Sequence, residues 1–214
     1  MIITRIQRLR KRKPRYAIYI DGKQCLELSD TTIGKFGLRV DDSLDDSKLE
    51  LIKKFDSEME AKTYAINYIS YRPRSSNEVL KYLRTKHFTK EVATSVIQHL
   101  QEVGLINDLE FARMFTRDRL KRKSIGESLL RQQLLSKGVS RSNIDCVIKE
   151  YITNSDQRKA AEEAARKRLN QMKRSFSKLE FMQRQKKLYD FLTRRGFNHD
   201  IAAQTVQSIL RDKQ

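Results

Sequence analysis

Apolar residues recur at helical spacing from about residue 57 to the end of the chain, and short polar breaks separate the periodic stretches. Three of these breaks share one order: a basic residue, a small or polar residue, an apolar residue, and then Ser, Thr or Asn. They are Lys86-His87-Phe88-Thr89, Lys137-Gly138-Val139-Ser140 and Arg195-Gly196-Phe197-Asn198. This order is typical of a helix end, an anchoring apolar residue and the N-cap of the next helix.

The apolar positions around the three copies also agree. Leu83, Leu134 and Leu192 each stand three residues before the basic position. The basic positions are 51 and then 58 residues apart, which is the scale of a supersecondary repeat. We therefore expect three helical repeats in which these leucines are buried at equivalent places.

The pattern predicts an all-α tandem array of three three-helix repeats, curved and elongated, with a small N-terminal β-hairpin extension. The extension and an acidic connector cover 1–56, and the repeats cover 57–107, 108–153 and 154–214. Capping boxes, Ser75-x-x-Glu78 and Ser177-x-x-Glu180, predict where two of the helices begin. The expected helices are 57–71, 76–86, 90–102, 108–121, 126–137, 141–152, 156–173, 177–195 and 200–210.

The N-terminal part differs in kind. Residues 15–20 and 23–28 predict two strands joined by a type I′ turn at Asp21-Gly22, and 2–9 is a candidate third strand. A short helix is expected over 29–36. Residues 41–60 hold eight acidic residues against three lysines, and we interpret them as a connector into the first repeat helix.

The net charge of +18 changes the functional picture, because such an excess favours a polyanionic partner. Basic residues gather in the runs 1–15, 112–123, 158–174 and 184–195. In the second run, Arg113, Arg117 and Lys121 stack on one face of the predicted helix. A stripe of this kind suits a phosphate backbone or an acidic protein groove. For any single run, a plain solvated helix face remains an alternative.

The sequence contains none of the motifs GxxxxGK[ST], GxGxxG, HExxH or GxSxG. Cys25 and Cys146 are far apart and have no CxxC partner or neighbouring histidine at ligand spacing, which indicates reduced intracellular thiols, with a single disulfide as a minor alternative. We therefore expect no enzyme activity, no cofactor, no metal and no catalytic residue. Without an apolar run of about 18 residues or a signal peptide, a cytoplasmic protein that does not enter a membrane is expected.

The junction of the first two repeats carries the most specific motif, GLINDLEFAR at 104–113, and YRPRS stands upstream at 71–75. Leu83 stands eight residues after Ser75. Together these features resemble the RecX family of recombinase regulators, and the resemblance covers about 57–210. Two departures are His87, where the other copies have glycine, and an elongated third repeat. The first suggests a helix end without the left-handed glycine.

The resemblance implies a modulator of the RecA recombinase that binds RecA and its nucleoprotein filament along the groove. Family members usually inhibit filament growth, ATP hydrolysis, strand exchange and co-protease activity. Contact with RecA or DNA is expected from basic residues of the motif region and the helix after it. These are Arg72, Arg74, Arg113, Arg117, Arg119, Lys121 and Arg122.

An alternative from another class is a general nucleic-acid-binding architectural protein without sequence preference. The charge favours both, since single- and double-stranded DNA would be bound weakly and independently of sequence in either case. A monomer is expected, because nothing resembles a coiled-coil seam. The sequence leaves open how the recombinase is affected and what the basic N-terminal extension does.

Overall fold

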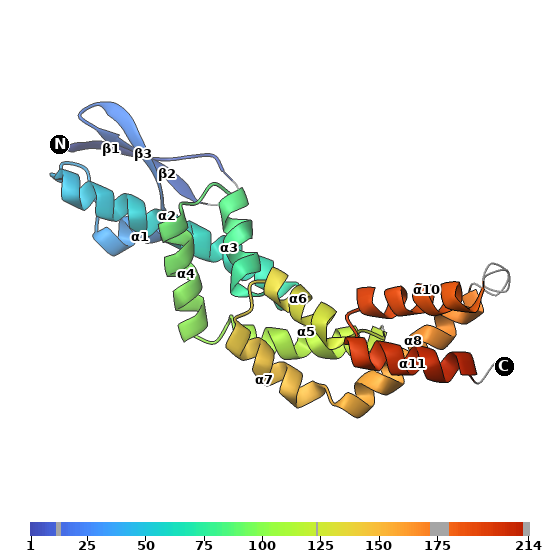
Figure 1. Ribbon diagram of the computed structural model, residues 1–214. Coiled ribbons are helices and arrows are strands. Elements are labelled where there is room, and N and C mark those ends of the chain that lie inside the picture. The colour runs from blue at the N-terminus through green and yellow to red at the C-terminus, as the bar shows by residue number, and fades with distance from the viewer. Residues whose placement is uncertain (12–13, 123, 172–179, 212–214) are drawn as a thin grey trace. The chain divides into compact units, whose positions relative to one another are not determined.

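The computed structural model describes residues 1–11, 14–122, 124–171 and 180–211. The chain divides into two units, one made of Met1–Pro73 with Val79–Leu105 and the other of Arg74–Glu78 with Ile106–Gln214 (Figure 1). The strands are β1 (Ile3–Arg8), β2 (Arg15–Ile20) and β3 (Lys23–Ser29). The helices are α1 (Asp30–Phe36), α2 (Asp46–Ser70), α3 (Ser76–Thr85), α4 (Lys90–Glu102), α5 (Asp108–Arg122), α6 (Glu127–Ser136), α7 (Arg141–Tyr151), α8 (Asn154–Gln171), α10 (Phe181–Arg194) and α11 (His199–Arg211).

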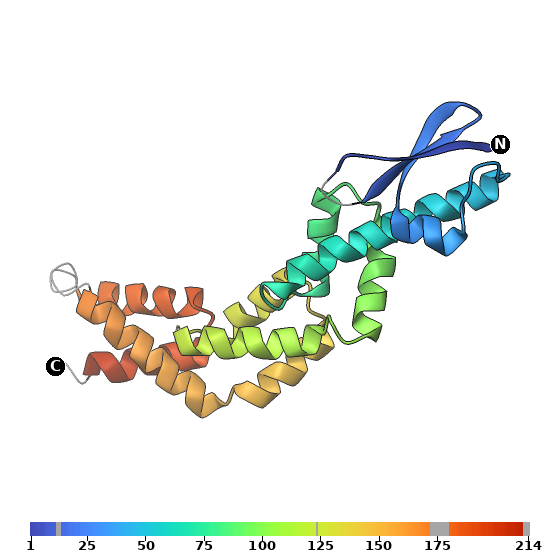
Figure 2. The same ribbon diagram turned by 180° about the vertical axis from the view of Figure 1, so that it is seen from behind.

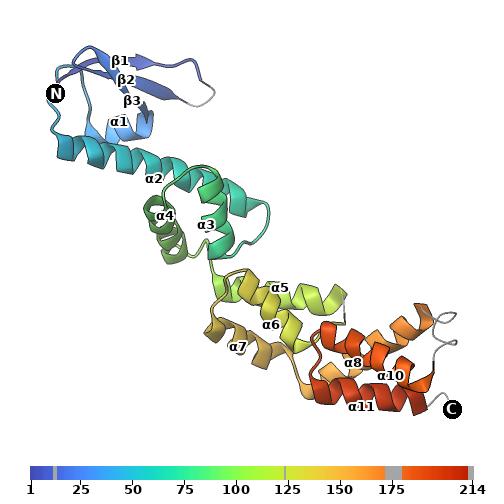
Figure 3. The same ribbon diagram turned by 45° about the horizontal axis from the view of Figure 1, so that its top comes forward.

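The three strands form an antiparallel sheet in the order β1-β2-β3. Asp21 and Gly22 between β2 and β3 have φ of 48° and 78°, as a type I′ turn requires. The predicted hairpin and third strand are therefore confirmed. Apolar residues of one sheet face pack with Ile52 of α2, so the sheet is supported by helices (Figure 3).

A buried polar cluster joins the sheet to α2. The carboxylate of Asp56 accepts hydrogen bonds from the Ser29 backbone N–H at 2.9 Å and the Thr32 hydroxyl at 2.6 Å. Arg15 of β2 donates to the same carboxylate at 2.9 Å. Burial acts to raise the pKa of Asp56, but these hydrogen bonds and the Arg15 charge outweigh it and leave the pKa below its ordinary value. Asp56 therefore remains ionised and ties β2, α1 and α2 together.

Helix α2 begins at Asp46, so the expectation of a connector up to about residue 57 was wrong from Asp46 onward. Asp45 is the N-cap, and its side chain accepts a hydrogen bond from the Lys48 N–H at 2.6 Å. Ile52 is fully buried, and Lys53 pairs with Glu50 one turn earlier. The acidic composition concealed an amphipathic first half of the helix: Asp46 and Glu50 are exposed, while Ile52 packs against the sheet.

The remaining helices follow the periodicity closely. Ser75 and Glu78 make the predicted reciprocal capping box, with Glu78 N–H to Ser75 Oγ at 3.2 Å and Ser75 N–H to Glu78 Oε2 at 3.4 Å. Thr89 caps α4 through the Val92 N–H. Leu83, Leu134 and Leu192 are fully buried, which confirms the interpretation of the three leucine positions.

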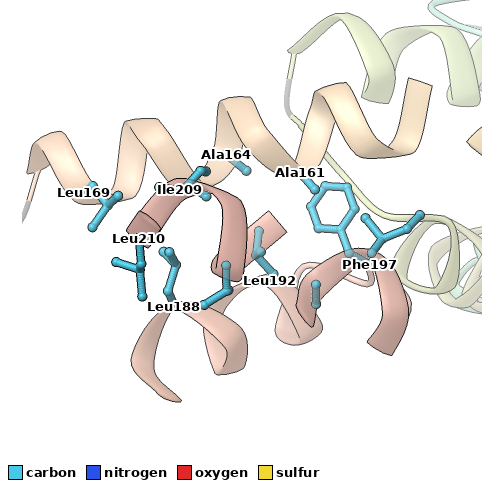
Figure 4. Packing of buried hydrophobic residues seen from close by; sticks show 12 residues of the cluster. Ala161, Ala164, Leu169, Leu188, Leu192, Phe197, Ile209 and Leu210 are labelled. Carbon is cyan, nitrogen blue, oxygen red and sulfur yellow. The ribbon is translucent and has the colours of Figure 1, made fainter. Parts of the chain in front are cut away.

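The described residues of the second unit form two apolar cores. One lies among α5, α6 and α7. The other lies among α8, α10 and α11, where Leu188, Leu192 and Ile209 meet the alanine-lined face of α8 (Figure 4). The small alanine side chains let the neighbouring helices lie close along α8 (Figure 2).

The start of the second helix of the third repeat differs from the prediction. Helix α10 begins at Phe181, and Glu180 is its N-cap without a side-chain hydrogen bond. Glu180 is therefore not the third residue of a helix capped by Ser177. Ser177 itself lies outside the described residues, so only the Glu180 end of that expected capping box is described.

The three related turns share one backbone conformation. Gly138 and Gly196 have φ of 79° and 85°, and His87 has φ of 67°. The first helix end therefore adopts the left-handed conformation although it lacks glycine, contrary to what the substitution suggests. Histidine is among the residues that tolerate this region better than most.

Within the second unit, two of these turns receive the start of another helix. The Ser75 hydroxyl donates to the Lys137 carbonyl at 2.6 Å, and Lys137 Nζ pairs with Glu78 at 2.8 Å. In the same way, the Gly126 N–H donates to the Arg195 carbonyl at 2.8 Å, and the Ser128 N–H donates to the Gly196 carbonyl at 3.0 Å. Both contacts use carbonyls at a helix C-terminus, which have no partner within their own helix.

Candidate nucleic-acid interface

The basic stripe predicted on α5 is only partly available to a partner. Arg113 is engaged on both sides, since its guanidinium pairs with Glu110 at 2.5 Å and with Glu150 of α7 at 3.0 Å. These hydrogen bonds raise the pKa of Arg113 above its ordinary value. Arg113 thus joins α5 to α7.

Arg119 is also turned toward the protein. Its guanidinium lies 4.8 Å from the centre of the Phe115 ring, and the residue is half-buried. Arg117 and Lys121 are exposed, and Arg122 is exposed with a loose pair to Asp118 at 3.7 Å. Arg117, Lys121 and Arg122 are therefore the α5 cations directed to solvent.

The two arginines of the YRPRS segment belong to different units. Arg72 is exposed at the end of the first unit's Met1–Pro73 segment, and it donates to the Pro73 carbonyl at 2.9 Å. Arg74 is half-buried and belongs to the second unit. Neither residue lines the cleft that α5, α8 and α10 form in the second unit.

A basic cleft of about 470 Å³ lies in the second unit, where the end of α5 and the following loop meet α8 and α10. Five cationic side chains line it, and only two of them, Lys121 and Arg122, were among the predicted contact residues. The other three are Lys167, Arg168 and Arg195. The lining also includes Phe191 and Ser124. We call this site the basic cleft.

Phe191 holds two of the cleft's arginines in place. The guanidinium carbon of Arg168 lies 5.3 Å from the centre of its ring, and that of Arg195 lies 5.0 Å from the same centre. Arg195 is further fixed by a hydrogen bond from its Nη1 to the Ser124 carbonyl at 2.9 Å. Because a guanidinium beside an aromatic ring keeps most of its donors unused, both arginines can still bind an anion.

The lining holds one acidic residue, Glu163, whose carboxylate accepts a hydrogen bond from the Ser124 hydroxyl at 3.1 Å. Lys121, Lys167, Arg168 and Arg195 make no ion pair with any described acidic residue. Five cations against one lining carboxylate, with only Arg122 paired to a described acid, leave the basic cleft with an excess of positive charge, which is the electrostatic condition for binding an anion.

The described ranges contain no group of three His, Cys, Asp or Glu side chains arranged to hold a metal ion. No helix in these ranges is both long and apolar enough to span a membrane. Cys25 and Cys146 are both exposed and unpaired.

Sequence reasoning recognised the basic runs 158–174 and 184–195 but did not identify Phe191 or the convergence around it. A signal was present, since Phe191 and Arg195 are four residues apart and so share a helix face. Arg168 comes from another helix, and only the packing of α8 on α10 brings it to the same ring.

Models of a known protein family match the chain in three consecutive parts. Three family models match: the first three-helix domain of RecX over 61–100, the second over 107–148 and the third over 156–206. These matches, with the N-terminal three-stranded sheet, confirm the predicted fold class of three three-helix repeats with a small β extension.

Curated relatives and solved structures agree. The regulatory protein RecX of Listeria monocytogenes serotype 4b (strain CLIP80459) is 32% identical over 202 residues, covering 94% of this chain and 73% of the relative. RecX of Clostridium botulinum (strain Alaska E43 / Type E3) is 28% identical, covering 97% and 96%. A crystal structure of a regulatory protein RecX matches with a TM-score of 0.72 at 25% identity, covering 99% and 98%. RecX from Lactobacillus salivarius matches with a TM-score of 0.63 at 25% identity, covering 72% and 97%.

Proposed function

The chain belongs to the RecX family of regulatory proteins, and on that premise we propose that it modulates a RecA recombinase in the cytoplasm as an inhibitor. It binds RecA and its nucleoprotein filament along the groove. In doing so it limits filament growth, ATP hydrolysis, strand exchange and co-protease activity. The observation that carries this proposal is the match of all three repeats to the three RecX domains in order.

The charge of the molecule supports the proposal. A protein with a net charge of +18 associates readily with a filament that contains nucleic acid and acidic protein surface. In the second unit, the solvent-directed cations of α5 and the basic cleft offer such a filament a positive surface. A modulator that acts by binding needs a surface of this kind and no catalytic residue.

The test is ATP hydrolysis by the purified recombinase on single-stranded DNA, with this protein titrated from substoichiometric to equimolar ratios. We expect hydrolysis to fall as the protein is added, and strand exchange to fall with it. Unchanged hydrolysis at an equimolar ratio, with the added protein shown to be folded, would contradict the proposal.

A matched pair of variants locates the working surface. Arg117→Glu with Lys121→Glu reverses two exposed cations one turn apart on α5, and neither residue is paired with a described acid. Arg141→Glu with Lys149→Glu makes the same change of charge on exposed positions of α7. We expect the α5 variant to lose inhibition while the α7 variant keeps it. Arg113 is left unchanged, because a glutamate there would face Glu110 and Glu150 and weaken the packing of α7.

The second candidate function is sequence-independent nucleic-acid binding without a recombinase partner, and the excess positive charge of the basic cleft favours it. Capture of the recombinase after nuclease treatment separates the two functions. Retained capture supports a modulator that contacts RecA directly, whereas capture lost with the nucleic acid supports the architectural alternative.

A further inference from the structure

We propose that the basic cleft binds the sugar–phosphate backbone of a single nucleic-acid strand, with Arg168 and Arg195 as phosphate ligands that Phe191 holds in place. This inference rests on the proposed function for its setting, a recombinase filament assembled on single-stranded DNA. All the residues that line the basic cleft belong to the second unit.

The charge of the basic cleft indicates an anionic ligand. Five cations and one carboxylate line about 470 Å³, and the carboxylate of Glu163 is already bound by Ser124. Cations so close together repel one another unless an anion lies between them. They come from the end of α5, from α8 and from the end of α10, so the charge surrounds the space rather than lying on one helix face.

The arrangement of the arginines favours phosphate. Each guanidinium is planar and can direct two parallel N–H groups at two phosphate oxygens. Arg195 uses Nη1 for the Ser124 carbonyl, and both guanidiniums lie within 5.3 Å of the centre of the Phe191 ring. Fixing these side chains before binding reduces the entropy that is lost on binding.

The size of the basic cleft favours one strand over a duplex. About 470 Å³ is the volume of a small-molecule pocket, which admits a nucleotide unit of a flexible strand. Duplex readers, by contrast, insert a helix or ribbon into a groove roughly 12 Å wide, and the basic cleft is concave rather than protruding. A phosphodiester backbone also supplies a charge at every nucleotide, which suits several cations in one site better than isolated carboxylates do.

The experiment measures binding of a fluorescent oligo(dT) strand to the full-length protein, without recombinase, at several salt concentrations. If the five cations each meet a phosphate, log K should fall with log salt at a slope of about −3.5 for a single strand. Lys167→Glu with Arg168→Glu should reduce the steepness of that slope by about 1.4, because two phosphate contacts are lost.

Two further variants serve as control and safeguard. Arg158→Glu with Arg166→Glu changes the charge equally on the same helix, at exposed positions that do not line the basic cleft, and should leave the slope near the parental value. If Arg168→Glu disturbs packing on Phe191, Lys121→Glu with Lys167→Glu tests the site instead, because both lysines are exposed.

Phe191→Leu tests the role of the ring without changing the net charge. Leucine keeps an apolar side chain against the α8–α10–α11 core but offers no aromatic face to Arg168 and Arg195. We expect oligo(dT) binding to weaken roughly two- to fivefold for each arginine that is released. Phe181→Leu, the same substitution at an exposed position of α10 outside the basic cleft, is the matched control and also leaves the net charge unchanged.

Equal slopes for the Lys167/Arg168 and Arg158/Arg166 variants would overturn the proposal, as would parental binding by Phe191→Leu. If the cleft variants keep DNA binding but lose capture of nuclease-treated recombinase, the basic cleft binds acidic protein and the proposal is wrong. Because the DNA measurement contains no recombinase, its failure leaves the proposed function standing. A lack of effect on the recombinase ATPase likewise leaves the DNA site standing.

Discussion

The turn after α3 has the same backbone conformation as the turns after α6 and α10, but its surroundings differ from theirs. In all three the middle residue adopts a left-handed φ, between 67° and 85°. The turns after α6 and α10 both lie in the second unit, and each of them is contacted by the start of another helix. The comparison separates two reasons for a glycine: a backbone angle, and the close approach of a neighbour.

Close approach explains why the last two turns carry glycine. A Cβ built on Gly196 would lie 2.2 Å from the Leu129 nitrogen, and one built on Gly138 would lie 2.3 Å from the Asn77 Cβ. Gly126, which faces Gly196, has an ordinary negative φ, and a Cβ there would lie 2.0 Å from the Gly196 carbonyl carbon. His87 has an exposed side chain, so its position requires only a left-handed φ and not the absence of a Cβ. A left-handed residue other than glycine is therefore tolerated in the first turn alone.

The largest expected effect is that of Gly196→Ala. The new methyl group meets backbone, which cannot move aside as a flexible side chain can. Left-handed strain of about 1–2 kcal/mol and overpacking of about 1–3 kcal/mol together predict a loss of roughly 2–5 kcal/mol. The free energy of unfolding, from urea titration followed by far-UV circular dichroism, measures it.

Gly104→Ala is the matched control for Gly196→Ala. Gly104 also has a left-handed φ, 74°, but a Cβ there would meet no heavy atom of the described chain within 4 Å. The free energy of unfolding of Gly104→Ala should therefore fall only by the left-handed strain, about 1–2 kcal/mol. Equal losses for the two alanines would show that the contact with Leu129 contributes nothing.

A smaller effect is expected from Ser75→Ala, which removes both a helix cap and the hydrogen bond to the Lys137 carbonyl. Loss of the cap costs about 0.5–2 kcal/mol, and leaving a carbonyl without its partner costs about 1–3 kcal/mol. Together they predict a loss of roughly 1.5–5 kcal/mol in the same urea titration, with a midpoint just below that of Gly196→Ala. Thr89→Ala removes only a cap, so its loss should stay near 1 kcal/mol. A Ser75→Ala loss no larger than this would argue against the bond to Lys137.

The features predicted correctly from sequence are those set by near neighbours in the chain. The type I′ turn at Asp21-Gly22 and the Ser75–Glu78 capping box each depend on a few adjacent residues. The start of α2 differs from the prediction, because composition alone makes its acidic residues resemble a linker. In fact Asp45 caps it and only a few apolar positions, such as Ile52, mark its buried face.

The candidate site was predicted less completely, because its geometry depends on packing between helices. Periodicity places Arg113 on the exposed side of α5, but Glu150 on α7 reaches it in the folded chain. In the same way, Arg168 and Arg195 are 27 residues apart and meet only through the Phe191 ring. Local spacing shows which residues share a helix face, while the partner across that face comes from tertiary structure.

The smallest expected effect is that of His87→Gly, which brings the first turn to the sequence of the other two. Glycine relieves left-handed strain of about 1–2 kcal/mol, a figure that is an upper bound for histidine because it tolerates this region better than most residues. Against this, glycine makes the unfolded chain more flexible, which costs about 0.4–1 kcal/mol. The two effects nearly cancel, so the free energy of unfolding should change by less than about 1 kcal/mol in either direction.

His87→Ala completes this test, since alanine keeps the strain but removes the imidazole. If the first turn needs only its backbone angle, alanine should also stay within about 1 kcal/mol of the parent protein. A loss above about 2 kcal/mol in either variant, measured by the same urea titration, would mean that the His87 side chain makes a stabilising contact. The first turn would then resemble the glycine turns in being shaped by a neighbour.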